Sequence, residues 1–245
     1  MSRIRIIGLT LVAVFAVSAV GVASASGAEY VYKVAGAKLV GAKEITSKAK
    51  TTYILKGEAL GVKTTVECPT QKLSAGAAIK GGEPGTSEET VVFEGCKPTA
   101  PAECVGKKVK VENTPVKNEI VTVVKPAAKV GKLATLFTPK AGTLFTTITF
   151  EGCLFNTKAE VTGTAAALDS PGKVEQKVGT LIFEEGAEEI TEVECLKETV
   201  ACISITKNKL APFRQKVELK FAGNRATLKG QSEVELVSKE VWGVF

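Results

Sequence analysis

Short stretches in which apolar and polar residues alternate recur along most of this chain. Residues 216–221 and 233–236 alternate strictly, and residues 143–150 are rich in threonine, isoleucine and phenylalanine. A period of two places successive side chains on opposite faces of a strand, whereas a helix needs a period near 3.6. The same reasoning predicts further strands at residues 51–55, 62–66, 90–93, 120–124 and 203–206.

Residues that favour turns separate these predicted strands. The clearest are a glycine-rich loop at residues 81–85 and an Asp-Ser-Pro-Gly turn at residues 169–172. The best helix candidate, residues 184–197, has only a weak helical pattern. We therefore expect an all-β fold, a disulfide-stapled β-sandwich or barrel. The length of 245 residues leaves open whether residues 29–245 form one domain or two packed, related β units.

One short motif occurs twice. Phe-Glu-Gly-Cys stands at residues 93–96 and again at 150–153, each time after a β-branched run, and Val-Glu-Cys stands at 66–68 and 193–195. We interpret the first repeat as one strand–turn unit used twice, with a cysteine anchoring the end of the strand. The apolar residues 241–245 are interpreted as a last strand in the core rather than a docking tail.

The first 28 residues have the pattern of a secretory signal. Arg3 and Arg5 precede an apolar stretch at residues 6–22, which is followed by small residues typical of a cleavage site. We expect cleavage after Ala28. The apolar stretch is shorter than the roughly 20 residues that a membrane-spanning helix needs, so no membrane span is expected after cleavage.

Six cysteines lie beyond the predicted signal, an even number that indicates up to three disulfides in an exported chain. Sequence alone does not select among the 15 pairings that six cysteines allow. Proximity in the chain favours pairing Cys96 with Cys104 and Cys195 with Cys202, which leaves Cys68 for Cys153. Cys-x-x-Cys spacing is absent, so neither a zinc site nor a redox-active pair is expected.

Composition removes several classes of function. The chain has no histidine and a single aspartate, Asp169, which excludes Ser-His-Asp catalysis, histidine-ligated zinc and an Asp-rich calcium loop. Its formal net charge of +6 is spread along the chain rather than concentrated, so no nucleic-acid partner is expected. We expect no catalytic residues, no cofactor and no resident metal.

Glutamates supply the remaining candidate chemistry. An acidic run is a candidate segment for binding a cation or docking to a basic surface, but a solvated loop or helix face is the favoured interpretation; it comprises Glu184, Glu185, Glu188, Glu189, Glu192 and Glu194. A glycan hydrolase would need a carboxyl pair beside aromatic side chains. Trp242 and the three tyrosines lie near the two ends of the sequence, so no such cluster is expected.

The layout resembles an uncharacterised family of exported, cysteine-containing, β-rich proteins from soil actinobacteria. The residues that carry the resemblance are the Val-Glu-Cys and Phe-Glu-Gly-Cys strand ends already described, Val-Thr-Gly-Thr at 161–164, and residues 226–230 leading to 241–244. The resemblance implies export and β structure but no reaction. Cys195, Cys202 and the acidic run are peculiar to this chain.

These observations predict an exported, non-catalytic structural or binding protein at the cell envelope or in the extracellular medium. Anionic cell-wall polymers or another envelope protein are the expected partners, because lysine-rich strand faces attract anions. A glycan-active hydrolase with a Glu pair and a self-associating adhesion module are the alternatives. The sequence gives no oligomeric state.

Overall fold

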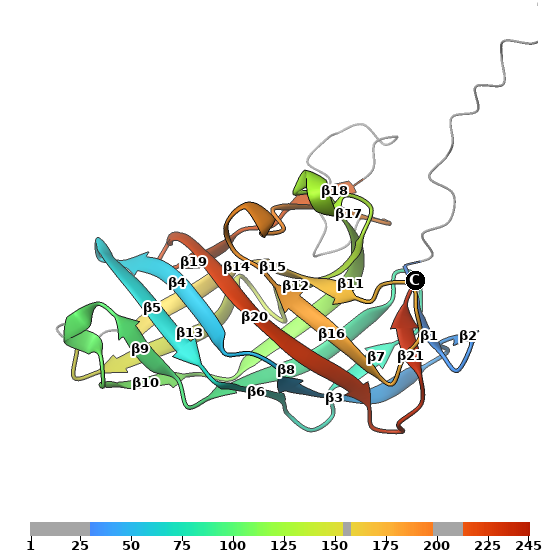
Figure 1. The fold of residues 1–245 in the computed structure, drawn as a ribbon, viewed down its shortest axis with the longest axis horizontal. Coiled ribbons are helices and arrows are strands. Elements are labelled where there is room, and N and C mark those ends of the chain that lie inside the picture. The colour runs from blue at the N-terminus through green and yellow to red at the C-terminus, as the bar shows by residue number, and fades with distance from the viewer. Residues whose placement is uncertain (1–29, 154–157, 198–212) are drawn as a thin grey trace, which may run out of the picture.

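The computed structural model describes residues 30–153, 158–197 and 213–245 (Figure 1). These residues form antiparallel strands and three short 3-10 turns, with no α-helix among them: η1 (Ala102–Cys104), η2 (Ala127–Lys129) and η3 (Gly186–Glu188). The all-β prediction is therefore confirmed. The predicted signal, residues 1–28, and the predicted strand at 203–206 lie outside the described residues.

A ring of antiparallel strands closes on itself to form a barrel. In order around the ring are β11 (Thr114–Lys125), β12 (Leu133–Pro139), β15 (Ala165–Ser170), β16 (Val178–Phe183), β20 (Asn224–Leu236), β3 (Ala42–Ala49), the tandem strands β6 (Thr70–Leu73) and β7 (Ala78–Lys80), and β8 (Thr86–Glu94). β8 pairs back onto β11, where Ser87 lies opposite Asn118, and this closes the ring.

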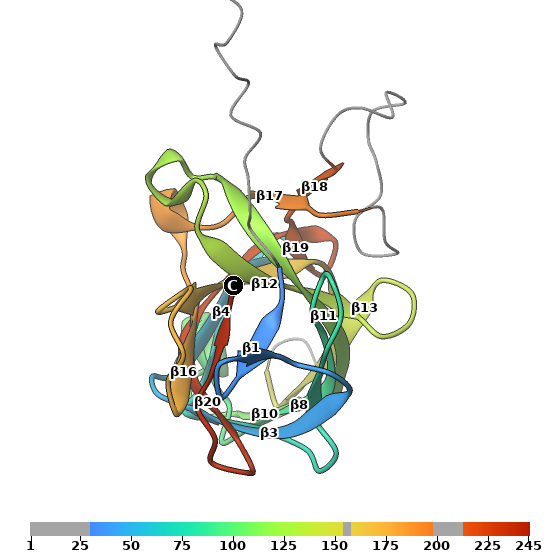
Figure 2. The ribbon, with the colours of Figure 1, turned by 90° about the vertical axis from the view of Figure 1, so that its right-hand side faces the viewer.

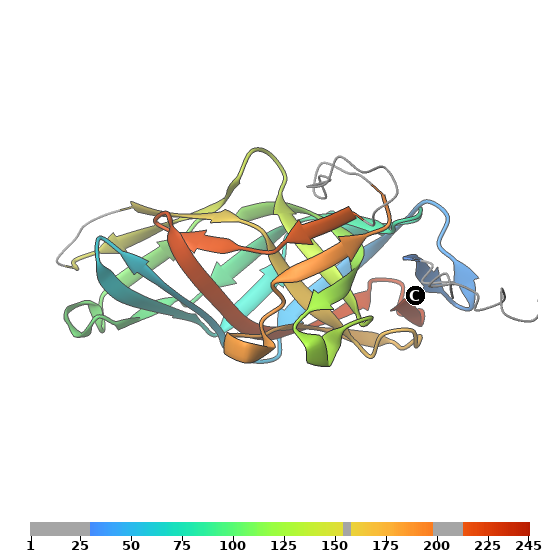
Figure 3. The ribbon, with the colours of Figure 1, turned by 90° about the horizontal axis from the view of Figure 1, so that it is seen from above.

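A second group of strands extends the wall along the long axis of the molecule (Figures 1 and 3). It begins at β20, whose residues 224–226 pair with β19 and residues 227–229 with β4. One flank is β4 (Tyr53–Ala59), β5 (Val62–Cys68) and β9 (Lys97–Ala100), and the other is β19 (Leu219–Phe221), β14 (Lys158–Gly163), β13 (Leu144–Glu151) and β10 (Lys108–Val111). β20 thus connects the two groups.

A small sheet covers one end of the ring. β1 (Tyr32–Val34) lies between β2 (Ala37–Lys38) and β21 (Trp242–Val244), and Figure 2 shows β1 surrounded by β3, β8, β11, β16 and β20. The amide of Gly85 donates a 2.6 Å hydrogen bond to the carbonyl of Tyr30, which ties this end sheet to β8. Trp242 and Val244 are buried, so residues 241–245 do contain a core strand, as predicted.

The outer face of β11 and β12 is also covered, by β17 (Glu192–Cys195) and β18 (Phe213–Lys216). Val121, Val123 and Val193 pack in this outer layer and are almost completely buried. Because β11 is buried on both faces here, residues 120–124 are apolar except for Thr122 and do not alternate. Residues 184–197, the helix candidate, form η3 and β17 instead, so that prediction was wrong.

The predicted disulfide pairing was wrong for the four cysteines whose partners the structure describes. Cys68 pairs with Cys96 and Cys104 with Cys153, with Cα–Cα distances of 4.0 and 4.8 Å. The antiparallel register of β6 and β8 explains the first pair, because Thr70 lies opposite Glu94. Cys68 is two residues before Thr70 and Cys96 is two residues after Glu94, so the same register places the two cysteines opposite each other. Cys195 is also disulfide-bonded, and Cys202 lies outside the described residues.

Both copies of Phe-Glu-Gly-Cys have the same local structure. Each phenylalanine and glutamate end a strand, β8 or β13, and each glycine has a positive φ, +67° at Gly95 and +76° at Gly152. Only glycine adopts this left-handed conformation without strain. The glycine turns the chain so that the following cysteine reaches a cysteine elsewhere in the wall, which confirms the strand–turn unit.

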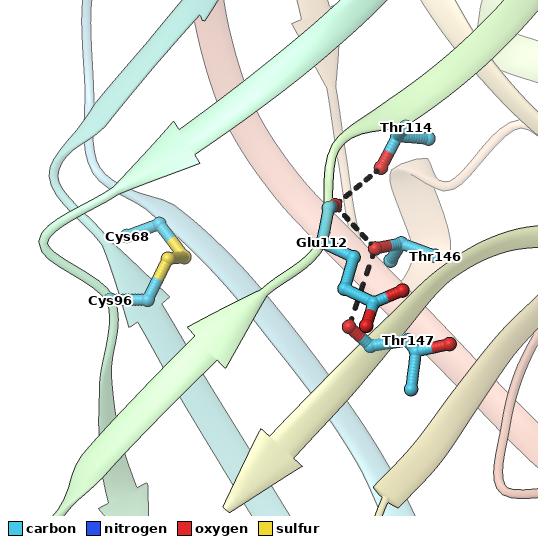
Figure 4. Close-up of a disulfide and its surroundings, with 6 residues drawn as sticks. All are labelled: Cys68, Cys96, Glu112, Thr114, Thr146 and Thr147. Atoms are coloured by element: carbon cyan, nitrogen blue, oxygen red, sulfur yellow. Dashed lines mark hydrogen bonds between the residues drawn. A yellow bond between two sulfur atoms is a disulfide. The ribbon is translucent and has the colours of Figure 1, made fainter.

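The two strand groups meet at bends in the wall, and Figure 4 shows one of them beside the Cys68–Cys96 disulfide. Between β10 and β11, the carbonyl of Glu112 accepts hydrogen bonds from the hydroxyls of Thr146 at 2.6 Å and Thr114 at 3.4 Å. The Glu112 amide donates to the carbonyl of Thr147. Residues of β13 therefore supply hydrogen-bond partners for the backbone amide and carbonyl of Glu112 at the bend.

Candidate functional site

The interior of the barrel contains a cavity of about 140 Å³. Inward-facing residues of the ring and of the second strand group line it, and Tyr32 and Trp242 of the end sheet line it as well. An apolar cavity of about 150 Å³ holds a benzene-sized molecule in another protein. The cavity therefore has room for a small ligand.

Aromatic side chains from distant parts of the sequence meet in the lining: Tyr32, Tyr53, Trp242 and the phenylalanines Phe93, Phe137, Phe145 and Phe183. The ring of Tyr53 lies edge-on to Phe93 and Phe183, with centroid distances of 5.4 and 5.9 Å. Aromatic residues that lie far apart in the sequence thus share one interior. Ring closure brings Tyr32 and Trp242 there together with phenylalanines from the middle of the chain.

One carboxyl in the cavity belongs to Glu89 of β8. The side-chain amide of Asn118 donates to one Glu89 oxygen at 2.6 Å and to the hydroxyl of Ser87 at 2.9 Å. The other carboxyl oxygen of Glu89, Oε2, and the amide oxygen of Asn118 are buried without a hydrogen-bond partner. Burial raises the pKa of Glu89 to about 7, although the hydrogen bonds from Asn118 and Ser87 lower it.

The second carboxyl is that of Asp169, the only aspartate in the chain. We expected Asp169 in a turn, but it lies in β15 with its side chain buried, and the turn begins at Pro171. The hydroxyl of Thr135 donates to its carboxyl at 3.1 Å. Burial raises the pKa of Asp169 to about 7, against the smaller effect of that hydrogen bond.

Tyr32 lies close to both carboxyls. Burial raises the pKa of its hydroxyl, the negative charges of Asp169 and then Glu89 raise it further, and a hydrogen bond with Ser87 opposes the shift. Three strands that are far apart in the sequence, β1, β8 and β15, thus bring one phenol and two carboxyls into the same electrostatic environment.

The side chains of a second polar cluster in the cavity hydrogen-bond to one another. The hydroxyls of Tyr53 and Ser232 hydrogen-bond to each other at 2.6 Å, Ser232 donates to the Gln71 side-chain oxygen, and Ser47 donates to the same oxygen at 3.2 Å. This network fixes side chains of β3, β4, β6 and β20 in one arrangement. The buried side-chain atoms of the lining that have no partner are Oε2 of Glu89 and Oδ1 of Asn118, which are acceptors, and Nε1 of Trp242, which is a donor.

The predicted acidic run lies on the outside of the barrel, opposite basic side chains. Glu184 and Glu188 bind the buried ammonium of Lys129, which also donates to the Glu188 carbonyl at 2.6 Å. Glu185 pairs with Lys56 at 2.8 Å, and Glu189 pairs with Arg225 at 3.0 Å. Glu192 and Glu194 pair with Arg214 at 3.6 and 4.0 Å, so the run is committed to internal ion pairs.

Within the described ranges, no group of three or more Cys, Asp or Glu side chains is placed to hold a metal ion. The part of the chain described here also contains no helix long and apolar enough to cross a membrane. The disulfides indicate an oxidising environment. Comparisons with protein-family models, with curated proteins and with solved structures find no match to this chain.

Glu89 and Asp169 were missed for a physical reason. Asp169 shares its face of β15 with the buried residues Ala165 and Ala167, and this alternation was a signal that its side chain points inward. Glu89 follows Glu88, and neighbouring residues of a strand point to opposite faces of the sheet. The sequence Glu-Glu does not show which of the two side chains points into the barrel. Only the closure of the ring identifies the interior.

Proposed function

We propose that this chain is an exported, non-catalytic binding protein that holds a small, largely apolar molecule inside its barrel. The observation that carries the proposal is the cavity of about 140 Å³ inside the barrel, whose walls are mainly aliphatic and aromatic side chains. Small-molecule sites typically combine such a lining with a few polar groups that fix orientation. The secretory pattern of residues 1–28 and the disulfides support a role outside the cytoplasm or at the cell envelope.

The two alternatives have less support. Glycan chains bind in open clefts with arrays of hydrogen-bonding groups, whereas here Tyr53, Ser232, Gln71 and Ser47 are bonded to one another. Self-assembly through strand edges needs open edges. The strands of the ring are paired on both sides around its circumference in the described residues, which reduces the edge available for pairing with another copy.

The proposal is tested by filling the cavity. Leu181 and Ile182 are neighbours on β16, and Leu181 lines the cavity whereas Ile182 does not. We expect toluene to bind the oxidised protein in calorimetry and ligand-observed NMR, Leu181→Trp to weaken binding at least tenfold, and Ile182→Trp to leave it unchanged. Absence of toluene binding to the unmodified protein, or equal loss in both variants, would overturn the proposal.

A further inference from the structure

The interior of the barrel has an imbalance of charge and of hydrogen-bonding groups. Among the described residues that line it, Glu89 and Asp169 are acidic and none is lysine or arginine. A buried carboxylate without a cationic partner is costly, because it has lost its hydration and gained no opposite charge. The protein places two carboxyl groups in one cavity and lines that cavity with no positively charged side chain.

The open hydrogen-bonding atoms beside Glu89 are acceptors. Oε2 of Glu89 and Oδ1 of Asn118 have no partner, and the Asn118 amide hydrogens are already donated to Glu89 and Ser87. A ligand that satisfies this part of the site must therefore provide donors. An ammonium group provides three donors and a positive charge, which matches both the acceptors and the acidic side chains.

The rest of the lining suits the body of such a ligand. Tyr32 lines the same cavity as the two carboxyls, whose negative charges act on its hydroxyl, and its ring lies 6.2 Å from that of Trp242. Aromatic faces attract cations and also bury apolar groups. The nearby apolar wall includes Leu181 and Val91.

We infer that the ligand of this cavity is a small organic amine with an apolar body, bound with its ammonium group between Glu89, Asn118 and Asp169. This inference rests on the proposed function and deepens it by naming the chemical class of the ligand. The body of the amine occupies the aromatic part of the cavity, and the carboxyls become ionised as the cation enters.

Binding of the amine depends on pH in a defined direction. The groups that face Glu89 and Asp169 are Tyr32 from β1, Ser87 from β8, Asn118 from β11 and Thr135 from β12, none of which is cationic. At pH 5.5 the carboxyls are protonated and neutral, whereas at pH 8 they are ionised in the presence of an alkylammonium ion. The affinity for the amine therefore rises between these pH values, and the affinity for a neutral ligand does not.

The experiment compares three probes of similar shape by calorimetry at pH 5.5 and pH 8: toluene, benzyl alcohol and benzylamine. We expect benzylamine to bind at least tenfold tighter than benzyl alcohol at pH 8 and to lose most of that advantage at pH 5.5. Glu89→Gln removes the advantage but retains toluene binding. Glu88→Gln, on the outer face of the same strand, retains both.

The outcomes separate the two proposals. If toluene binds and benzylamine is no tighter than benzyl alcohol, the amine inference is overturned and the proposed function stands. If no probe binds, the proposed function is overturned and the inference falls with it. An amine advantage that persists in Glu89→Gln and Asp169→Asn alike also contradicts the inference, because it shows that the ammonium binds elsewhere.

Discussion

Glu89 and Asn118 lie on neighbouring strands inside the barrel, and the Asn118 amide donates a 2.6 Å hydrogen bond to only one of the two carboxyl oxygens of Glu89. The other oxygen is buried and without a partner. Asn118 also donates to Ser87, so the amide holds Glu89 in place while leaving its charge uncompensated. Burial without a cationic partner favours the protonated carboxyl in the empty protein, despite the opposing hydrogen bond from Asn118, and it favours a cation when a ligand is present.

Stability should fall as pH rises towards neutrality. The pKa of Glu89 rises from 4.5 to about 7 on folding, and that of Asp169 rises from 3.8 to about 7. The folded protein therefore binds more protons than the unfolded chain between about pH 4 and pH 7, and the free energy of unfolding decreases across that window. The loss is on the order of 3 kcal/mol for Glu89 and 4 kcal/mol for Asp169.

Urea unfolding of Glu89→Gln between pH 4 and pH 8 measures this effect. We expect a shallower pH dependence than in the unmodified protein and higher stability at pH 8. Glu88→Gln is the control, because the pKa of its outward-facing carboxyl is lowered mainly by the hydrogen bond and charge of Lys80, so its removal cannot make the fall in stability with pH shallower. An unchanged slope in Glu89→Gln would contradict the burial of its carboxyl.

Gly230 is required for the close approach of Tyr53. A Cβ at Gly230 would lie 2.6 Å from the Tyr53 ring, which must then move and break its hydrogen bond with Ser232. We expect Gly230→Ala to lower the free energy of unfolding by about 1–3 kcal/mol. Gly172→Ala, where the nearest atom is 3.6 Å away, should change it by less than about 0.5 kcal/mol. Equal effects of the two substitutions would exclude this packing role.

The two described disulfides should contribute comparably to stability. Cys68–Cys96 closes a separation of 28 residues and Cys104–Cys153 one of 49. Loop-closure entropy predicts about 4 kcal/mol for each, with only a few tenths between them. We expect the double variants Cys68→Ser/Cys96→Ser and Cys104→Ser/Cys153→Ser to lose similar stability in urea unfolding. Peptide mapping without reduction that finds Cys96 joined to Cys104 would refute the pairing itself.

Lys129 holds two turns together on the outside of the barrel. Its ammonium is buried, which lowers its pKa, but the hydrogen bonds and charges of Glu184 and Glu188 outweigh burial and leave the pKa raised. We expect Lys129→Ala to cost about 1–2 kcal/mol, a value reduced because both glutamates are partly exposed. Lys125→Ala, which removes an exposed partner of Glu192, should cost less than about 1 kcal/mol. A larger loss from Lys125→Ala than from Lys129→Ala would contradict this assignment.

The fold class followed from local patterns, but the site did not. Alternating and β-branched runs identified β4, β5, β8, β11, β13, β19 and β20, and the repeated Phe-Glu-Gly-Cys motif correctly indicated strand ends fixed by cysteines. The pairing of Cys68 with Cys96 depends on the register of β6 against β8, which neighbouring residues do not encode. The meeting of Tyr32, Glu89 and Trp242 depends on ring closure. Export, the family resemblance and attraction to anionic wall polymers stay predictions.

The most direct test of the account is a crystal structure of the oxidised protein soaked with toluene. We predict electron density for the ligand inside the barrel, between Trp242 and the apolar wall that includes Leu181. A barrel interior closed by its own side chains, with toluene absent or bound only on the outer surface, would contradict the claim that this fold exists to hold a small molecule.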